Sequence, residues 1–192
     1  MDIQRSKVEL RLAIKDRLSR LSPKDRIAEN RSLSKRILEA IPADAKDVCA
    51  YAALADEADM HEAILELLKC GHRIFLPRAE GGGTAFRRVT DLSALKLGRF
   101  GILEPDDSAP LLDPKALSIA LIPGRAFDRK GNRLGRGNGG YDIWMARQRK
   151  ENPATQFWGI ALECQIVQEI PAEAHDQTVD TIITARGNVM YN

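Results

Sequence analysis

The chain has 192 residues, of which 44% are hydrophobic and 29% charged, a composition typical of a globular protein and not of a disordered one. It contains no apolar run near the roughly 20 residues that a membrane helix needs, and its charged start does not resemble a secretory signal. These features predict a cytosolic (cytoplasmic) protein. The scattered cysteines Cys49, Cys70 and Cys164 exclude a disulfide framework and a zinc cluster, so each is expected in the core.

The formal net charge is only +2, but the charges are unevenly distributed. Residues 1–40 hold eleven Lys or Arg against six Asp or Glu, and residues 124–149 hold seven against two. Two local basic zones on a nearly neutral chain favour a small polyanionic ligand. Nucleic-acid binding by residues 1–40 is the alternative; it predicts strongly salt-dependent binding, and the lack of interleaved aromatic residues there argues against it.

The N-terminal residues predict a pair of helices. Hydrophobic residues recur at helical spacing from Lys7 to Leu21. Ser22, followed by Pro23 and Asp25, is typical of a helix start, because serine caps the first turn and proline suits the first helical position. The second helix is expected to run to about Ile41.

From Asp47 onward, short apolar strands alternate with helices. Strands are expected at 48–54, 73–77, 84–89, 116–123, 156–162 and 179–185, and helices at 59–70 and 141–150. Asp59 with Glu62 resembles a capping box at the start of the first of these helices. The segment 84–89 follows three glycines and is expected at an edge. The alternation predicts one α/β domain with a mostly parallel sheet (47–192) and the N-terminal helices (1–42) packed on it.

A glycine-rich segment at 131–140 is the most informative part of the sequence, with five glycines in ten residues. Glycine is favoured where the backbone approaches a ligand closely or adopts a positive φ. A helix is predicted directly afterwards, and the free N–H groups of a helix start attract phosphate. Arg133 and Arg136 add positive charges. The segment therefore predicts an anion-binding loop, and a merely flexible surface loop is the simpler alternative.

A dinucleotide site is a further alternative. Gly135, Gly137 and Gly140 match G-x-G-x-x-G, and Glu163 follows at about the expected 20 residues. However, a Rossmann turn follows its strand directly, whereas the predicted strand ends near Pro123, about twelve residues earlier. A nicotinamide-dependent oxidoreductase is therefore the weaker enzyme hypothesis, and no P-loop motif occurs.

The run PGRAFDRKGNRLGRGNGGYD at 123–142 resembles the signature of the 5-formyltetrahydrofolate cyclo-ligase family, PGxAFDxxGxRLGxGxGYYD. Further collinear matches are K-x-x-L-R at 7–11, D-E at 56–57, G-I-L-E-P at 101–105, P-x-E-x-H-D at 171–176 and V-D-x-I-I-T at 179–184. The resemblance covers nearly the whole chain. It implies a three-layer α/β/α fold of the type shared with sugar-phosphate isomerases and CoA transferases (NagB/RpiA/CoA transferase-like).

The same resemblance implies a reaction. Family members use ATP and Mg²⁺ to cyclise 5-formyltetrahydrofolate, with or without a polyglutamate tail, to 5,10-methenyltetrahydrofolate. ATP phosphorylates the formyl oxygen to an iminium phosphate, and N10 then attacks the activated carbon. A monomer without nucleic-acid or membrane partners is expected. The alternative is a paralogue that binds nucleotide or folate but has lost or redirected the cyclisation.

The resemblance also implies the site residues. The ATP-binding candidates are Lys7, Arg11, Arg133, Leu134, Gly135, Arg136, Gly137, Asn138, Gly139, Gly140 and Tyr141. Arg136 and Asn138 are the catalytic candidates. Glu57 and Gly140 are the substrate-binding candidates, with Glu57 holding the N–H edge of the pterin. Asp142 and Asp180 correspond to magnesium-binding positions, and His175 is expected to make structural hydrogen bonds.

Three departures from the family pattern fall in or beside the same loop. Gly140 stands where the family usually has tyrosine, Asn138 where lysine is common, and Ile143 where arginine is frequent. A lost stacking contact costs on the order of 1 kcal/mol, and a lost lysine removes a charge that would touch phosphate. These substitutions are the sequence support for the paralogue alternative.

Overall fold

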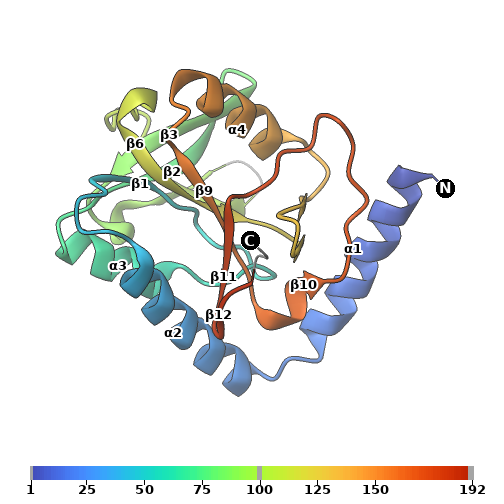
Figure 1. The fold of residues 1–192 in the computed structure, drawn as a ribbon. Coiled ribbons are helices and arrows are strands. Elements are labelled where there is room, and N and C mark those ends of the chain that lie inside the picture. The colour runs from blue at the N-terminus through green and yellow to red at the C-terminus, as the bar shows by residue number, and fades with distance from the viewer. Residues whose placement is uncertain (1, 99–100, 190–192) are drawn as a thin grey trace.

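The computed structural model describes residues 2–98 and 101–189 and is built around a seven-stranded sheet (Figure 1). Its strands are β1 (Asp47–Cys49), β2 (Arg73–Glu80), β3 (Gly83–Val89), β6 (Leu117–Pro123), β9 (Gln156–Ile160), β11 (Thr181–Thr184) and β12 (Gly187–Asn188). The spatial order is β12-β11-β9-β6-β1-β2-β3. The five inner strands are parallel, and only the edge strands β3 and β12 pair antiparallel. The predicted mostly parallel sheet is therefore confirmed.

Four α-helices lie within the described residues: α1 (Ile3–Ser19), α2 (Pro23–Ala40), α3 (His61–Lys69) and α4 (Gly140–Glu151). Ser22 caps α2 as predicted, because its side chain accepts a hydrogen bond from the backbone N–H of Asp25 at 3.1 Å. The predicted capping box of α3 does not form. The helix begins at His61, two residues after its expected start, and Asp59 instead accepts a hydrogen bond from the N–H of His61.

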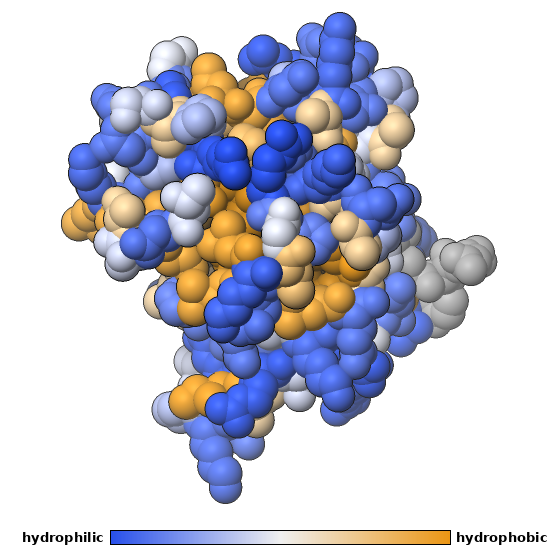
Figure 2. All heavy atoms as spheres, turned by 90° about the vertical axis from the view of Figure 1, so that its left-hand side faces the viewer, coloured by the Kyte–Doolittle hydropathy of each residue, from blue (hydrophilic) through white to orange (hydrophobic). Residues whose placement is uncertain are grey.

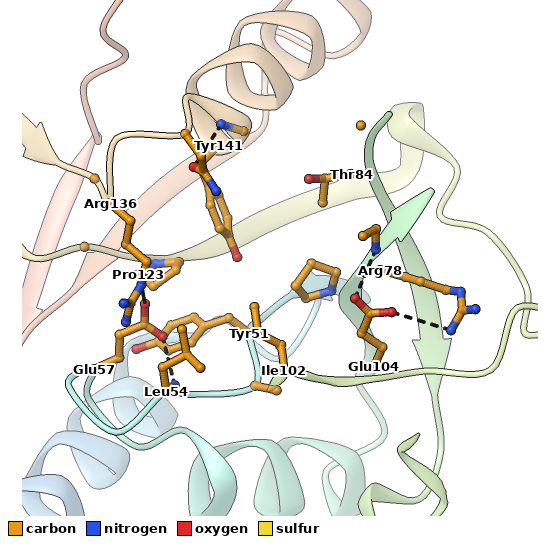
Figure 3. Close-up of a pocket in the computed structure, with 18 of the residues that line it drawn as sticks. Tyr51, Leu54, Glu57, Arg78, Thr84, Ile102, Glu104, Pro123, Arg136 and Tyr141 are labelled. Atoms are coloured by element: carbon orange, nitrogen blue, oxygen red, sulfur yellow. Dashed lines mark hydrogen bonds and ion pairs between the residues drawn. The ribbon is translucent and has the colours of Figure 1, made fainter. Parts of the chain in front are cut away.

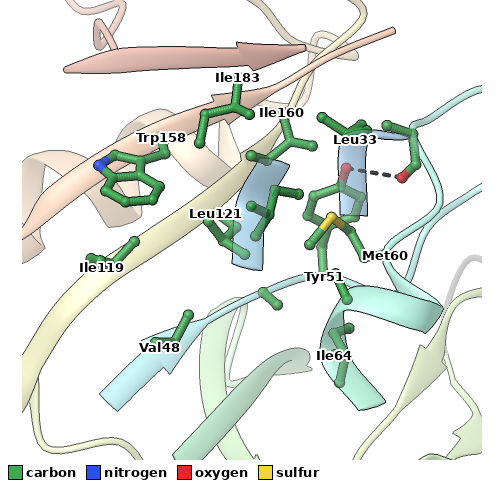
Figure 4. Packing of buried hydrophobic residues seen from close by; sticks show 14 of the residues in the cluster. Leu33, Val48, Tyr51, Met60, Ile64, Ile119, Leu121, Trp158, Ile160 and Ile183 are labelled. Atoms are coloured by element: carbon green, nitrogen blue, oxygen red, sulfur yellow. Dashed lines mark hydrogen bonds between the residues drawn. The ribbon is translucent and has the colours of Figure 1, made fainter. Parts of the chain in front are cut away.

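The helices lie in layers on the two faces of the sheet, with α2 and α3 on one face and α4 on the other (Figure 1). Strand β6 shows why, because Ile119 and Leu121 belong to one hydrophobic core, whereas Ala120 and Ile122 belong to the other. Figure 4 shows the first core, in which strand residues pack against residues of α2 and α3. The implied three-layer α/β/α fold is thus confirmed. Helix α1 joins the first core through Ile14.

The chain between β6 and α4 is more ordered than its glycine content predicts. Strands β7 (Ala126–Asp128) and β8 (Arg133–Leu134) form a small sheet with β10 (Ile166–Val167), so the glycine-rich segment is only partly a loop. Strands β4 (Lys96–Leu97) and β5 (Leu103–Glu104) form a hairpin. Short 3-10 helices lie at Leu92–Ala94, Pro114–Ala116 and Glu163–Gln165.

Two further expectations are corrected. The predicted strand 48–54 ends at Cys49, because the chain then leaves the sheet and Tyr51 is buried by loop packing, with its hydroxyl donating to the carbonyl of Ala58 at 3.0 Å. The apolar run at 48–54 therefore reflects the burial of residues 48–51, and not a strand along its whole length. Cys70 is exposed at the end of α3, whereas Cys49 is buried as expected and Cys164 is half-buried.

The surface is mixed in polarity. The face in Figure 2 shows hydrophobic atoms between hydrophilic side chains over the middle of the molecule. Across residues 2–98 and 101–189, none of the helices combines the length and the apolar character that a bilayer crossing requires.

Candidate active site

Two neighbouring cavities open where the parallel strands β1 and β6 end. The larger has a volume of about 270 Å³ and the smaller about 110 Å³. Four residues line both cavities: Arg133, Gly135, Arg136 and Asn138. The glycine-rich loop is therefore a thin wall between two sites, at the carboxyl edge where open α/β sheets bind ligands.

The loop adopts backbone conformations that favour glycine. Gly137 has a φ of 101° and Gly139 a φ of 68°, and Gly139 directly precedes α4. The Nε of Arg11 donates to the carbonyl oxygen of Gly135 at 2.9 Å, so a residue of α1 supports the loop from the far end of the sequence. The N-terminal N–H groups of α4 and nearby guanidinium groups together form an environment suited to phosphate.

Arg133 and Arg136 are held differently, although both belong to the wall. Arg133 is buried and donates to Asp142 Oδ2 at 2.8 Å, with its guanidinium 5.6 Å from the centre of the Tyr141 ring. Arg136 Nε donates to Glu57 Oε1 at 3.1 Å, and its guanidinium also pairs with Asp56. Arg136 therefore connects the smaller cavity with the acidic residues of the loop after β1.

Lys7 lines the smaller cavity, is buried, and forms ion pairs with two carboxylates. Its ammonium lies 2.9 Å from Glu173 Oε2 and 2.6 Å from Asp176 Oδ2. Burial alone would lower the pKa of Lys7, but the hydrogen bonds and charges of the two carboxylates raise it above its ordinary value. His175 is exposed beside this cluster, with its Nε2 3.7 Å from Asp176 Oδ1, and its side chain makes no hydrogen bond to another described residue of the kind expected of it.

Tyr141, one of the ATP-binding candidates, lines the larger cavity and not the smaller one. Its side chain points into the larger cavity (Figure 3). Its hydroxyl is buried and has no hydrogen-bond partner among the described residues. Burial raises the pKa of Tyr141, so the hydroxyl stays protonated and is available as a donor to a ligand.

The other predicted residues are divided between the two cavities. Glu57 lines the larger one, and its Oε2 accepts a hydrogen bond from Leu54 N at 3.0 Å. Gly140 lines the same cavity, and Asn138 Oδ1 accepts from its N–H at 3.3 Å. Leu134 lines the smaller cavity, but its side chain belongs to the hydrophobic core.

The two predicted magnesium ligands are not brought together. Asp142 lies in the first turn of α4 and lines the smaller cavity. Asp180 precedes β11, accepts from Phe157 N at 2.7 Å and lies 3.5 Å from Arg149 in the last turn of α4. Asp180 lines neither cavity among the described residues.

Sequence reasoning assigned no role to several residues that line these cavities. Arg125 follows β6 and pairs with Asp56, and it could have been found from its position just after the most apolar strand. Arg78 and Glu104 face the larger cavity from β2 and β5. Only the G-I-L-E-P match indicated Glu104, and nothing in the local pattern of β2 distinguishes Arg78.

The fold and cavities define a class: a three-layer α/β protein with two adjacent cavities that share a glycine-rich wall, the smaller of them lined by groups suited to an anion. The family model described as the 5-formyltetrahydrofolate cyclo-ligase family matches residues 3–185. The chain therefore belongs to the 5-formyltetrahydrofolate cyclo-ligase family.

Individual relatives agree with this assignment. The chain is 28% identical to a 5-formyltetrahydrofolate cyclo-ligase of Mus musculus, covering 94% of each protein. It is 29% identical to the Escherichia coli K12 protein of the same name, covering 89% of this chain and 96% of that one. The solved structure of Aquifex aeolicus 5,10-methenyltetrahydrofolate synthetase is 30% identical with a TM-score of 0.81, covering 96% of this chain and 92% of that one.

Proposed function

We propose that this chain catalyses the ATP- and Mg²⁺-dependent cyclisation of 5-formyltetrahydrofolate to 5,10-methenyltetrahydrofolate. The observation that carries the proposal is the thin wall between the two cavities. Phosphoryl transfer requires the acceptor oxygen and the phosphate to meet in line, and catalysis is mostly positioning and charge neutralisation. Because the two cavities share four lining residues, ligands that fill them lie next to each other, and the acceptor oxygen and the phosphate can meet where the cavities adjoin.

The larger cavity suits the two-ring head of the folate. Apolar residues that line it include Leu54, Ile102 and Pro123. A volume of about 270 Å³ is just below the roughly 300 Å³ at which pockets for whole drug-sized ligands begin. The cavity therefore accommodates the head, and the p-aminobenzoylglutamate part extends outward.

The smaller cavity suits the phosphates of ATP. Arg11, Arg133 and Lys7 supply charge there, and the start of α4 supplies N–H donors. Because Lys7 and Arg11 belong to α1, we propose that residues 1–42 and 47–192 act as one functional domain. Gly135, Gly137 and Gly139 let the phosphates approach the backbone.

The chemistry then has two steps. The formyl oxygen attacks the γ-phosphorus and ADP leaves, which gives the iminium phosphate. N10 attacks the formyl carbon, its proton is released, and the oxygen departs as orthophosphate. Arg136 and Asn138 line both cavities, so we assign them to the phosphoryl group in transfer, where Arg136 neutralises charge and Asn138 donates a hydrogen bond.

The donor set is suited to magnesium at one of the two predicted positions. Asp142 offers hard carboxylate oxygens beside the anion-binding loop and would hold an Mg²⁺ that accompanies ATP, with phosphate oxygens and water as further ligands. Such an ion supplies charge neutralisation. Glu173, His175 and Asp176 also bring ligand atoms within 4.8 Å of one another, but the two carboxylates already hold the buried ammonium of Lys7 between them. Asp180 lines neither cavity among the described residues and is dropped from the proposed site.

The test is the ATP-dependent appearance of methenyltetrahydrofolate absorbance from purified protein, 5-formyltetrahydrofolate and Mg²⁺. Omitting ATP is expected to abolish product formation. Asp142→Ala is expected to abolish it as well, whereas Asp180→Ala, the matched control, is expected to retain it. If folded wild-type protein binds ATP but forms no product, the cyclisation is refuted. The redirected paralogue, which Gly140 and Asn138 support, then becomes the working hypothesis.

A further inference from the structure

The larger cavity has a carboxylate at each of two opposite ends. Figure 3 shows Glu57 next to Arg136 on one side and Glu104 next to Arg78 on the other. Glu57 belongs to the loop after β1 and touches the wall shared with the smaller cavity. Glu104 belongs to β5 and faces β2. A ligand that fills this cavity therefore meets one carboxylate at the phosphate side and another at the far side.

The carboxylate of Glu104 is held in a built position. The residue is only 6% exposed, and its Oε1 accepts a hydrogen bond from the N–H of Ala79 at 3.2 Å. The carboxyl group packs directly on Gly98, where any Cβ would overlap it. Glycine at this position thus gives the carboxylate the space it occupies.

One oxygen of Glu104 retains hydrogen-bonding capacity. Its Oε2 lies 3.6 Å from Arg78 Nη1, which is an ion pair but longer than a hydrogen bond. No described residue donates a hydrogen bond to Oε2. By contrast, Glu57 uses both oxygens, because Oε1 accepts from Arg136 and Oε2 from the N–H of Leu54. Of the two carboxylates, Glu104 therefore has more capacity to accept hydrogen bonds from a ligand.

The shape of the proposed substrate indicates which carboxylate meets which group. The folate head carries two adjacent donors, the 2-amino group and the N3–H, on the side of the ring system opposite the N5-formyl group. A carboxylate accepts such a donor pair through two parallel hydrogen bonds. The formyl oxygen must reach the wall to meet the phosphate, so the donor edge must point away from the wall, toward Glu104.

We propose that Glu104 is a specificity-determining residue that binds the amino–amide edge of the pterin, while Glu57 holds Arg136 at the reacting end. The inference rests on the proposed function, since it takes a reduced folate as the ligand of the larger cavity. It differs from the role that the sequence resemblance implies, in which Glu57 binds that edge.

The test compares two ligands in the absence of ATP: 5-formyltetrahydrofolate and its 2-desamino analogue. Their dissociation constants are measured by calorimetry with the full-length wild-type chain, Glu104→Gln and Glu57→Gln. Asp107→Asn is the matched control, because Asp107 is exposed and lies 4.0 Å from the same Arg78. Hydrogen bonds to a charged group lead us to expect that wild type prefers the natural ligand by about 10- to 100-fold.

Glu104→Gln is expected to erase this preference, whereas Glu57→Gln and Asp107→Asn are expected to keep it. A preference that survives in Glu104→Gln and disappears in Glu57→Gln overturns the inference alone. Binding of neither ligand by folded wild type overturns the proposed function, and the inference with it. If Glu104→Gln does not fold, Glu104→Asp replaces it, because it withdraws the carboxylate by one methylene. Wild-type discrimination by Glu104→Asp would equally overturn the proposal.

Discussion

Replacing Gly140 with tyrosine is expected to strengthen folate binding. Gly140 is the first residue of α4 and lines the larger cavity. A Cβ built there would meet Thr84 Oγ1 at 3.7 Å and Asn138 Oδ1 at 3.8 Å, which are ordinary contacts, and Gly140 is not among the positive-φ glycines. The fold therefore does not require glycine at this position. An aromatic ring in stacking or edge contact contributes about 0.5–1.5 kcal/mol beyond its buried area.

That range corresponds to a dissociation constant about 2- to 12-fold lower for 5-formyltetrahydrofolate. Calorimetry measures it, with the affinity for an ATP analogue expected to change less than twofold. Gly140→Ala is the control. Removing a helical glycine raises folding stability by roughly 0.5–1 kcal/mol in both variants, but alanine adds no aromatic ring. Weaker folate binding by a folded Gly140→Tyr protein would refute the reasoning and show that the ligand itself needs the space above Gly140.

Three further predictions follow from the contacts of the site. Tyr141→Phe removes a buried hydroxyl that has no hydrogen-bond partner among the described residues. Thermal unfolding is therefore expected to show equal or higher stability, and calorimetry to show weaker folate binding. A clear loss of stability would contradict this. The pKa of Asp176 is lowered, because the Lys7 hydrogen bond and charge outweigh the burial that raises it. The ionised carboxylate therefore contributes to folding stability at pH values above its unfolded pKa of 3.8. This contribution is lost as the pH falls through the lower pKa of the folded state. The stability deficit of Asp176→Asn in denaturant unfolding should be full at pH 7 and shrink below about pH 4; a deficit that does not vary with pH would exclude the ion pair as its cause. Arg11→Ala should weaken binding of an ATP analogue about tenfold without changing folate affinity, whereas Lys15→Ala, on the same helix face, should leave both unchanged.

The sequence predicts the elements of this fold better than it predicts the site. Strand and helix signals are local, so β6, β3 and α4 appear within a few residues of their expected bounds. The strand expected at 48–54 was overextended, because hydrophobicity reports burial and not hydrogen bonding to a neighbouring strand. The ion pair of Arg136 with Glu57 joins residues 79 positions apart and has no local signal.

Motif matching identified which residues belong to the site but not which side of the wall each of them faces. Tyr141 and Asp142 are consecutive, yet the first lines the larger cavity and the second the smaller, because adjacent side chains on a helix point about 100° apart. Asp180, by contrast, is a collinear match that lines neither cavity among the described residues. Assigning a motif residue to a ligand therefore requires the position of its side chain.

The wall explains why the loop combines glycine with arginine. A large side chain where the cavities adjoin would keep the two proposed ligands apart, and glycine leaves that space open. The charge then has to come from residues that reach over the backbone. Asn138 provides none, which leaves Arg136 as the flexible cation of the wall, and Arg136 is already paired with Glu57 and Asp56. A phosphoryl group must therefore compete with these two carboxylates for the guanidinium of Arg136.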